Sequence, residues 1–284
     1  MNSRSALVPN ERSWPPETSP LTSGSSVCLS PEATERLRLR LADYGDRIER
    51  DLRRRVLPIL LQFGDRLRVV GSGSLLAVGG DLLLVTARHV AELLWRASNG
   101  LRRAAVPGPE GILLPLAGCH GLAACDEAGL DADVAALRLP PALGWKLAQR
   151  WRPLTVAELA APEPPAGDLH LIAGYPQSLD DPRAPGGRLF ALATRALASA
   201  PAQAAAPVHP QYDLFFEYAR WGRAATEQAA QRLPALEGVS GAPVWRLAPQ
   251  ADGGLRLWPV AIQSGYFPNG YIRAKDLSLL RRFL

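Results

Sequence analysis

The stretch that decides the fold is residues 71–90, GSGSLLAVGGDLLLVTARHV. Two apolar runs, Leu75–Val78 and Leu82–Val85, flank the turn Gly79-Gly80-Asp81, which is typical of a tight β-hairpin. His89 follows closely, so we expect it just past the end of the second strand. This stretch predicts β-structure that presents an ionisable side chain where a strand ends.

Short apolar runs continue through the rest of the chain, separated by Gly, Pro and Asp, and each is a strand candidate. They are Gly111–Leu116, Val134–Leu139, Leu169–Ala173, Leu189–Thr194, Leu214–Tyr218, Pro243–Arg246, Leu255–Ile262 and Tyr271–Ile272. Strands at this density indicate barrels or a sandwich. The 284 residues are enough for two β-barrels that share an interface.

The N-terminal part differs from this pattern. Residues 1–29 are rich in Ser, Pro and Thr, and we expect a flexible tail. Residues 30–64 are predicted to form an amphipathic helix, because Ser30 can cap it and Pro31 suits its first position. Its apolar stripe recurs at spacings of three or four and consists of Leu37, Leu41, Tyr44, Ile48, Leu52 and Val56. That stripe is expected to pack on the protein's own barrel or to dock a partner, such as an activator, on helix 31–63.

The remaining chain divides at a proline-rich segment. We expect a first barrel over residues 65–140, a connection over 141–167 and a second barrel over 168–284.

Composition restricts the compartment and the partners. The 32 basic and 27 acidic residues give a net charge of +5, without an interleaved basic and aromatic stripe, so nucleic-acid binding is not indicated. No run approaches the roughly 18 apolar residues of a membrane span, and the first twenty residues lack the apolar core of a signal peptide. Only three cysteines occur. We therefore expect a reducing compartment, the cytoplasm of a bacterium.

Three segments carry the residue types of nucleophilic catalysis. They are Thr86-Ala-Arg-His89, Asp131-Ala-Asp133-Val-Ala-Ala-Leu-Arg-Leu and Gly238-Val-Ser240-Gly-Ala-Pro-Val. A serine hydroxyl needs an adjacent base, which a neutral histidine supplies, and a carboxylate can orient that histidine. Asp131 competes with Asp133 for the last role, and Asp133 is preferred because the apolar residues after it fit the motif.

Taken together, these segments resemble the His, Asp and Ser motifs of chymotrypsin/trypsin-like serine proteases, in the same order along the chain. The Asp segment departs by one extra Ala before its Leu. The resemblance implies a mainly β fold of two six-stranded antiparallel β-barrels, with a catalytic triad of His89, Asp133 and Ser240. It also implies an oxyanion hole formed by the amides of Gly238 and Ser240, and a serine endopeptidase that uses no cofactor and no metal.

The segment Ala261-Ile-Gln-Ser-Gly-Tyr266 resembles the strand that lines the specificity pocket of this family. The resemblance implies that Gln263, Ser264 and Gly265 bind substrate, although a plain strand ending in a turn remains open. His170 lies in a strand-like segment and is expected to be structural.

Two departures from the family matter. Val239 precedes Ser240, where secreted members carry the Asp that pairs with a new N-terminal amine. The chain therefore resembles the bacterial intracellular or HtrA-like branch, gated by a partner rather than by zymogen cleavage. Aligned with trypsin-like enzymes, Pro234 would lie near the base of the specificity pocket and Glu237 near its entrance. Ala224–Leu233 has a helical pattern ahead of Ser240, which makes this alignment unreliable. The substrate side chain that the pocket would bind is therefore not assigned.

Three further features of the chain admit more than one interpretation. Cys119, His120, Cys125 and Asp126 lack the second half of a zinc pattern, so loop cysteines are favoured. The run Arg53-Arg54-Arg55 favours a solvated helix face over an acidic partner. For the whole chain, the alternatives to an endopeptidase are a non-catalytic double-barrel binding module and an esterase with the same triad.

Overall fold

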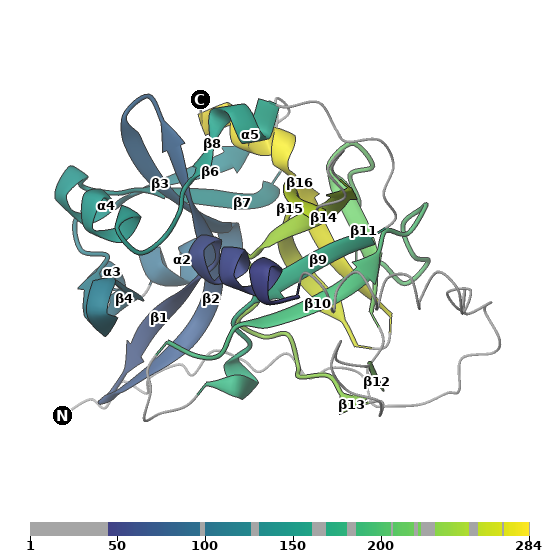
Figure 1. Ribbon diagram of the computed structural model, residues 1–284, viewed down its shortest axis with the longest axis horizontal. Helices are drawn as coiled ribbons and strands as arrows, with labels where there is room; N and C mark the ends of the chain where they lie inside the picture. Colours follow the sequence, from purple (N-terminus) through teal and green to yellow (C-terminus); the bar gives the residue numbers. More distant parts are fainter. Residues whose placement is uncertain are drawn as a thin grey trace, which may run out of the picture. The chain divides into compact units, whose positions relative to one another are not determined.

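The computed structural model describes residues 45–96, 100–125, 131–160, 169–180, 186–205, 207–218, 221–222, 231–249, 255–268 and 270–283. The expected tail and the first part of the expected helix lie outside these ranges. The described part begins with a helix at residues 45–55, drawn in dark purple in Figure 1. Two β-sheets follow in chain order, coloured blue to teal and green to yellow (Figure 1).

The first sheet has eight strands in the order β5-β4-β1-β2-β3-β7-β6, with β8 paired to β2. Their bounds are β1 Leu57–Phe63, β2 Arg66–Val78, β3 Asp81–Ala87, β4 Ala104–Pro107, β5 Leu113–Pro115, β6 His120–Cys125, β7 Asp131–Arg138 and β8 Leu154–Thr155. All pairs are antiparallel except β2–β8, which is parallel. The sheet curls because the long strand β2 pairs with β1 up to Gly73 and with β3 from Ser74 onward.

The second sheet has six strands in the order β10-β9-β14-β15-β16-β11, all antiparallel. Their bounds are β9 Leu169–Gly174, β10 Phe190–Arg195, β11 Asp213–Glu217, β14 Pro243–Pro249, β15 Leu255–Phe267 and β16 Tyr271–Asp276. A bridge between Ala196 and Phe216 joins the two edge strands, β10 and β11. The Leu197 amide donates to the Phe215 carbonyl beside it at 2.7 Å, so the sheet returns on itself as a barrel.

The remaining described elements are short. They are α2 Arg88–Arg96, α3 Gly100–Arg103, η1 Pro109–Gly111, α4 Pro141–Ala148, α5 Val156–Ala160, η2 Gln177–Leu179, η3 Leu277–Phe283 and the hairpin of β12 Trp221–Gly222 with β13 Gln231–Arg232. No helix in the described ranges combines the length and the apolar character that crossing a bilayer requires.

The mainly β fold with two curled antiparallel sheets is confirmed, and so are the predicted 71–90 hairpin and the six strands of the second barrel. The count of six in the first barrel is wrong, because β1 and β8 join it. The predicted helix to residue 64 is also wrong: the helix stops at residue 55 and Leu57–Phe63 forms β1. The hydrophobic pattern of the run LPILLQF does not distinguish a strand from a buried helix. Its pairing with β2 and β4 makes it a strand.

Two other predicted segments differ in detail. The connection 141–167 holds α4, β8 and α5, and β8 adds to the first sheet. The helix predicted over Ala224–Leu233 lies mostly outside the described residues, but its end, Gln231–Arg232, pairs as β13 with β12.

A single cluster of buried side chains links the N-terminal helix to both sheets. Ile48 and Leu52 of the helix pack in it with Leu76 of β2 and with Trp245 of β14. A predicted role of the apolar stripe, packing on the protein's own barrels, is therefore observed for the described part of the helix. The interface between the sheets is continuous core, which lets residues of the two sheets meet in fixed positions.

Candidate active site

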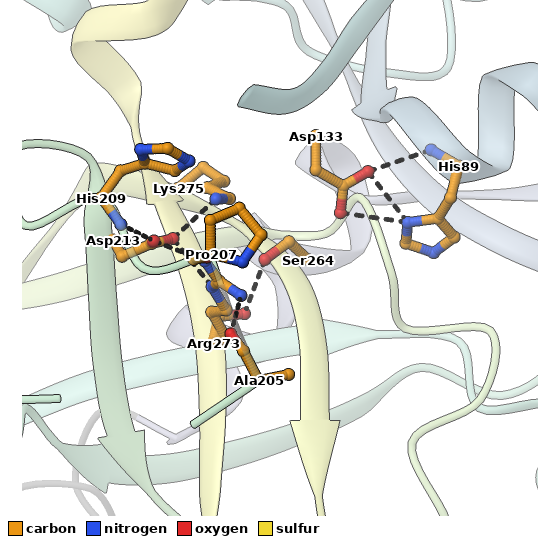
Figure 2. A network of polar contacts seen from close by, with 9 residues as sticks. All are labelled: His89, Asp133, Ala205, Pro207, His209, Asp213, Ser264, Arg273 and Lys275. Carbon is orange, nitrogen blue, oxygen red and sulfur yellow. Dashed lines mark hydrogen bonds and ion pairs between the residues drawn. The ribbon is translucent and has the colours of Figure 1, made fainter. Parts of the chain in front are cut away.

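His89 and Asp133 are in direct contact. His89 is the second residue of α2, directly after β3, and Asp133 lies near the start of β7. The His89 ring Nδ1 lies 3.0 Å from Asp133 Oδ1 and 3.1 Å from Oδ2, and the His89 backbone N–H donates to Oδ1 at 3.0 Å. Figure 2 shows the carboxylate facing both nitrogens. With Nδ1–H donated to a carboxylate, the imidazole holds the tautomer whose Nε2 accepts a proton.

A local irregularity of β7 turns Asp133 toward α2. Cys125 pairs with Asp131 but Ala124 pairs with Val134, so Ala132 and Asp133 bulge out of the ladder. Asp133 has φ of +47°, which side-chain-bearing residues adopt at a cost of roughly 1–2 kcal/mol. Bulges and strained residues of this kind re-aim side chains next to functional sites. The carboxylate of Asp133 contacts His89, and the side chain of the competing Asp131 lies outside the described residues.

Ser240 lies in a tight turn between two glycines with positive φ. Gly238 has φ of +89° and Gly241 has φ of +91°. A Cβ on Gly241 would lie 2.1 Å from Thr86 Oγ1 and 2.8 Å from the Ala87 amide nitrogen, so this turn packs directly on the end of β3. A Cβ on Gly71 would meet Val90 Cγ1 at 2.5 Å and the Ser240 carbonyl oxygen at 3.3 Å. Ser240 and the residue after His89 therefore flank the same glycine.

Ser72 of β2 holds this turn from the other sheet. Its amide donates to the Ser240 carbonyl at 2.8 Å, and its hydroxyl donates to the Gly238 carbonyl at 2.8 Å. The same hydroxyl accepts the Tyr175 amide at 2.9 Å, and Thr86 Oγ1 donates to the Ser72 carbonyl at 2.8 Å. Ser72 is fully buried. This role of Ser72 was not predicted, although Ser72 lies in the quoted 71–90 stretch.

Two backbone donors of the turn remain available. Within the described part of the chain, the amides of Gly238 and Ser240 donate to no carbonyl, whereas those of Val239, Gly241 and Ala242 do. Free amides at a glycine-rich turn attract an anion or a developing oxyanion. These are the two amides that sequence analysis assigned to an oxyanion hole.

The three residues expected to bind substrate follow on β15. Gln263 forms two backbone hydrogen bonds with the turn, both at 2.8 Å. Its carbonyl accepts a hydrogen bond from the Gly241 amide, and its amide donates one to the Ala242 carbonyl. Its side chain is fully buried, and neither amide atom has a partner among the described residues. The Ser264 hydroxyl instead donates to the Arg273 carbonyl (Figure 2). No heavy atom lies within 4 Å of a Cβ built on Gly265, so the space there is open.

The residues just before Ser240 tie its turn to β15. Tyr266 OH donates to Glu237 Oε1 at 2.6 Å, and the Tyr218 and Tyr266 rings meet edge to face. Burial, followed by the bond to Glu237, raises the pKa of Tyr266. Tyr218 OH donates to the Pro234 carbonyl at 3.0 Å. Glu237 and Pro234 thus lie in one rim beside the turn, and Tyr266 links Glu237 to β15, the strand of the expected substrate-binding residues.

The remaining candidates lie apart from these contacts. His170 is buried in β9, edge to face with Phe216, as expected for a structural histidine. Cys119 is a free buried thiol whose pKa burial raises to about 11. The Cys125 side chain and Asp126 lie outside the described residues. In the described ranges, no three His, Cys, Asp or Glu side chains gather closely enough to bind a metal ion.

Comparison with known proteins adds little to this geometry. No protein-family model and no curated protein matches the chain. Among solved structures, the thermostable serine protease AL20 from an extremophilic microorganism is 14% identical with a TM-score of 0.47, over 81% of this chain and 94% of that one. Deg5 is 14% identical with a TM-score of 0.46, over 85% and 92%.

A structure from a study of the intrinsically disordered Sesbania mosaic virus VPg protein is 16% identical with a TM-score of 0.43, over 80% of this chain and 87% of that one. All three TM-scores lie below 0.5, so these likenesses carry no argument about activity. The fold rests on the strand pairing described above.

Proposed function

We propose that the chain is a trypsin-like serine endopeptidase in which Ser240 is the nucleophile, His89 the general base and acid, and Asp133 the residue that orients His89. The observation that carries the proposal is the His89–Asp133 contact, with Nδ1 3.0 Å from Oδ1, next to the turn that bears Ser240. A histidine fixed by a carboxylate beside a serine is the arrangement that activates a hydroxyl.

The chemistry follows from these roles. Ser240 Oγ attacks the substrate carbonyl carbon while His89 Nε2 takes the hydroxyl proton. The tetrahedral oxyanion accepts hydrogen bonds that the backbone amides of Gly238 and Ser240 donate. His89 then gives the proton to the leaving amine, which departs and leaves an acyl-enzyme. Water attacks this ester with His89 as base, which releases the acid and restores Ser240. The route needs no cofactor.

We further propose that a partner gates activity, rather than zymogen cleavage. Val239 is fully buried, and its Cγ1 would lie 2.8 Å from a Cβ on Gly174. A buried apolar side chain at this point offers no ion pair to a new N-terminal amine. N-terminal sequencing of active protein tests the idea, and a trimmed chain whose new amine is required for activity would overturn it. A bacterial cytoplasm remains our proposal for the compartment, supported by the few cysteines.

Labelling with a fluorophosphonate probe tests the nucleophile. We expect labelling of the wild-type protein and none of Ser240→Ala or His89→Ala. Ser178→Ala is the matched control, since Ser178 also lies near the turn and bonds the Ala235 carbonyl. Absence of labelling, also with candidate activators present, would favour a non-catalytic binding module. A peptide-library digest beside a set of ester substrates then separates endopeptidase from esterase.

A further inference from the structure

A basic pocket lies away from the Ser240 turn, where the N-terminal helix meets both sheets. Its volume is about 570 Å³, and its walls are Arg47, Ile48, Arg50, Asp51, Arg54, Arg55, Arg152, Glu158, Arg256 and Leu257. Six guanidinium groups against two carboxylates give the walls a formal charge of +4 (six minus two). So many like charges in one concavity repel one another unless something else compensates them.

Tertiary structure assembles these arginines from distant parts of the chain. Arg47, Arg50 and Arg54 recur at spacings of three and four on the helix, which aligns them on one face. Arg152 follows α4, and its amide donates to the Arg54 carbonyl at 2.6 Å. Arg256 comes from β15, in the second sheet.

The two carboxylates of the pocket are already bonded, chiefly to Arg55. This side chain is 5% exposed and contacts Glu158 Oε1 at 2.9 Å and Asp51 Oδ2 at 3.2 Å. Arg152 Nη1 also lies 3.5 Å from Asp51 Oδ1. Burial raises the pKa of Glu158, but the Arg55 bond and charge and the bonds from Thr155 outweigh it and hold that pKa below its usual value. Both carboxylates therefore compensate the charge of the buried Arg55.

The other arginines keep their charge for a ligand. Among the described residues, Arg47, Arg54 and Arg256 form no ion pair, and Arg50 Nε donates only to the Asp46 carbonyl. A guanidinium does not deprotonate in a protein, so it cannot relieve the repulsion by losing a proton. Its fork of N–H donors matches the oxygens of a phosphate group in paired hydrogen bonds.

We propose that this pocket binds a small polyphosphate anion, either an inorganic phosphate chain or the phosphates of a nucleotide. Its volume lies within the roughly 300–1,000 Å³ of small-ligand sites. The four arginines that have no carboxylate partner among the described residues match a triphosphate group, which carries about four negative charges at neutral pH. The proposal is independent of the activity proposed for Ser240.

Isothermal titration calorimetry of the full chain in about 50 mM salt tests the site, because arginine–phosphate contacts are screened at higher salt. The probes are inorganic tripolyphosphate, ATP and adenosine. We expect tripolyphosphate and ATP to bind and adenosine not to bind. ATP binding more tightly than tripolyphosphate would identify a nucleotide ligand, whereas equal affinity would identify the phosphate chain as the whole ligand.

Charge-removing variants separate the pocket from general attraction to a basic protein. Arg50→Gln with Arg54→Gln should weaken binding at least tenfold, with the fold checked by circular dichroism. Arg53→Gln is the matched control, since Arg53 lies on the same helix, pairs with Glu49 and does not line the pocket. An equal loss in this control would overturn the proposal. So would the absence of binding by either phosphate probe, or binding of a 20-nucleotide single strand without binding of tripolyphosphate.

Discussion

Two carboxylates of this protein, Asp133 and Asp213, sit in polar networks built on opposite principles (Figure 2). The Asp213 side chain is fully buried and meets two cations, Arg273 and Lys275, while the His209 amide donates to it at 2.7 Å. The Asp133 side chain is 26% exposed and meets His89, which is 51% exposed and can lose its charge. The first network compensates a buried charge, whereas the second pairs a partly exposed carboxylate with a partly exposed histidine.

The cost of each network also differs. A buried carboxylate needs full compensation, and Asp213 receives it from Lys275 Nζ at 2.7 Å and from Arg273 Nε at 2.9 Å. Arg273 in turn donates to the carbonyls of Ala205 and Pro207, which fixes the loop ahead of β11. Asp133 has a strained backbone instead, at φ of +47°. Local strain of this kind is tolerated where position matters more than stability.

The largest expected effect comes from Asp133→Asn. An amide cannot hold the required imidazole tautomer, so the turnover of the proposed hydrolysis should fall by roughly 10⁴-fold. Stability should change by about 1 kcal/mol or less, because the site is partly exposed. Hydrolysis of a substrate from the peptide-library digest and urea unfolding measure the two effects. Asp81→Asn, at an exposed ion pair with Arg138, should leave both nearly unchanged, and a turnover loss below tenfold in Asp133→Asn would contradict this role.

Asp213→Asn should show the reverse pattern. It leaves Lys275, which is 4% exposed, beside a neutral partner, and we expect a loss of about 3–5 kcal/mol in the free energy of unfolding. Urea unfolding followed by fluorescence measures it. The double variant Asp213→Asn with Lys275→Met should recover part of the loss, since it removes the uncompensated charge. A loss no larger than that of Asp81→Asn would show that the buried network does not stabilise the protein.

Low pH should remove the difference in stability between the wild type and Asp213→Asn. Burial raises the pKa of Asp213, but the bonds from Arg273, His209 and Lys275 outweigh it, so its pKa in the folded protein lies below the usual value. A lowered folded pKa stabilises the protein fully above the unfolded carboxyl pKa, about 3.9, and this stabilisation is lost as pH falls through the folded pKa. Below about pH 4 the stability of the wild type should therefore approach that of Asp213→Asn. Parallel pH profiles would contradict this.

The smallest effect concerns backbone strain. Asp133→Gly should be more stable than Asp133→Ala by about 0.5–1 kcal/mol, because glycine adopts positive φ without the Cβ clash. At Asp213, which lies in β11 without positive φ, the order should reverse, since glycine weakens a regular strand. Urea midpoints of the four variants measure both differences. The same order at both positions would mean that Asp133 is not strained.

The sequence alone predicted what depends on local pattern. The Gly79-Gly80 turn between two apolar runs predicted the β2–β3 hairpin, and short apolar runs separated by Gly, Pro and Asp predicted the strands of the second sheet. The motif around Ser240 supplies glycine at residues 238 and 241, and glycine adopts the positive φ found there without strain. These features need no information from distant residues.

What depends on pairing and packing was decided by tertiary structure. The run Leu57–Phe63 reads equally well as helix or strand until β2 and β4 pair with it. The apolar residues after Asp133 favoured it from the sequence, but the bulge in β7 that brings its carboxylate to His89 depends on the pairing with β6. Ser72, the Asp213 network and the convergence of Arg47, Arg152 and Arg256 join residues far apart in the chain. The sequence specifies which side chains are present, but only the packed core of the folded protein determines which of them face one another.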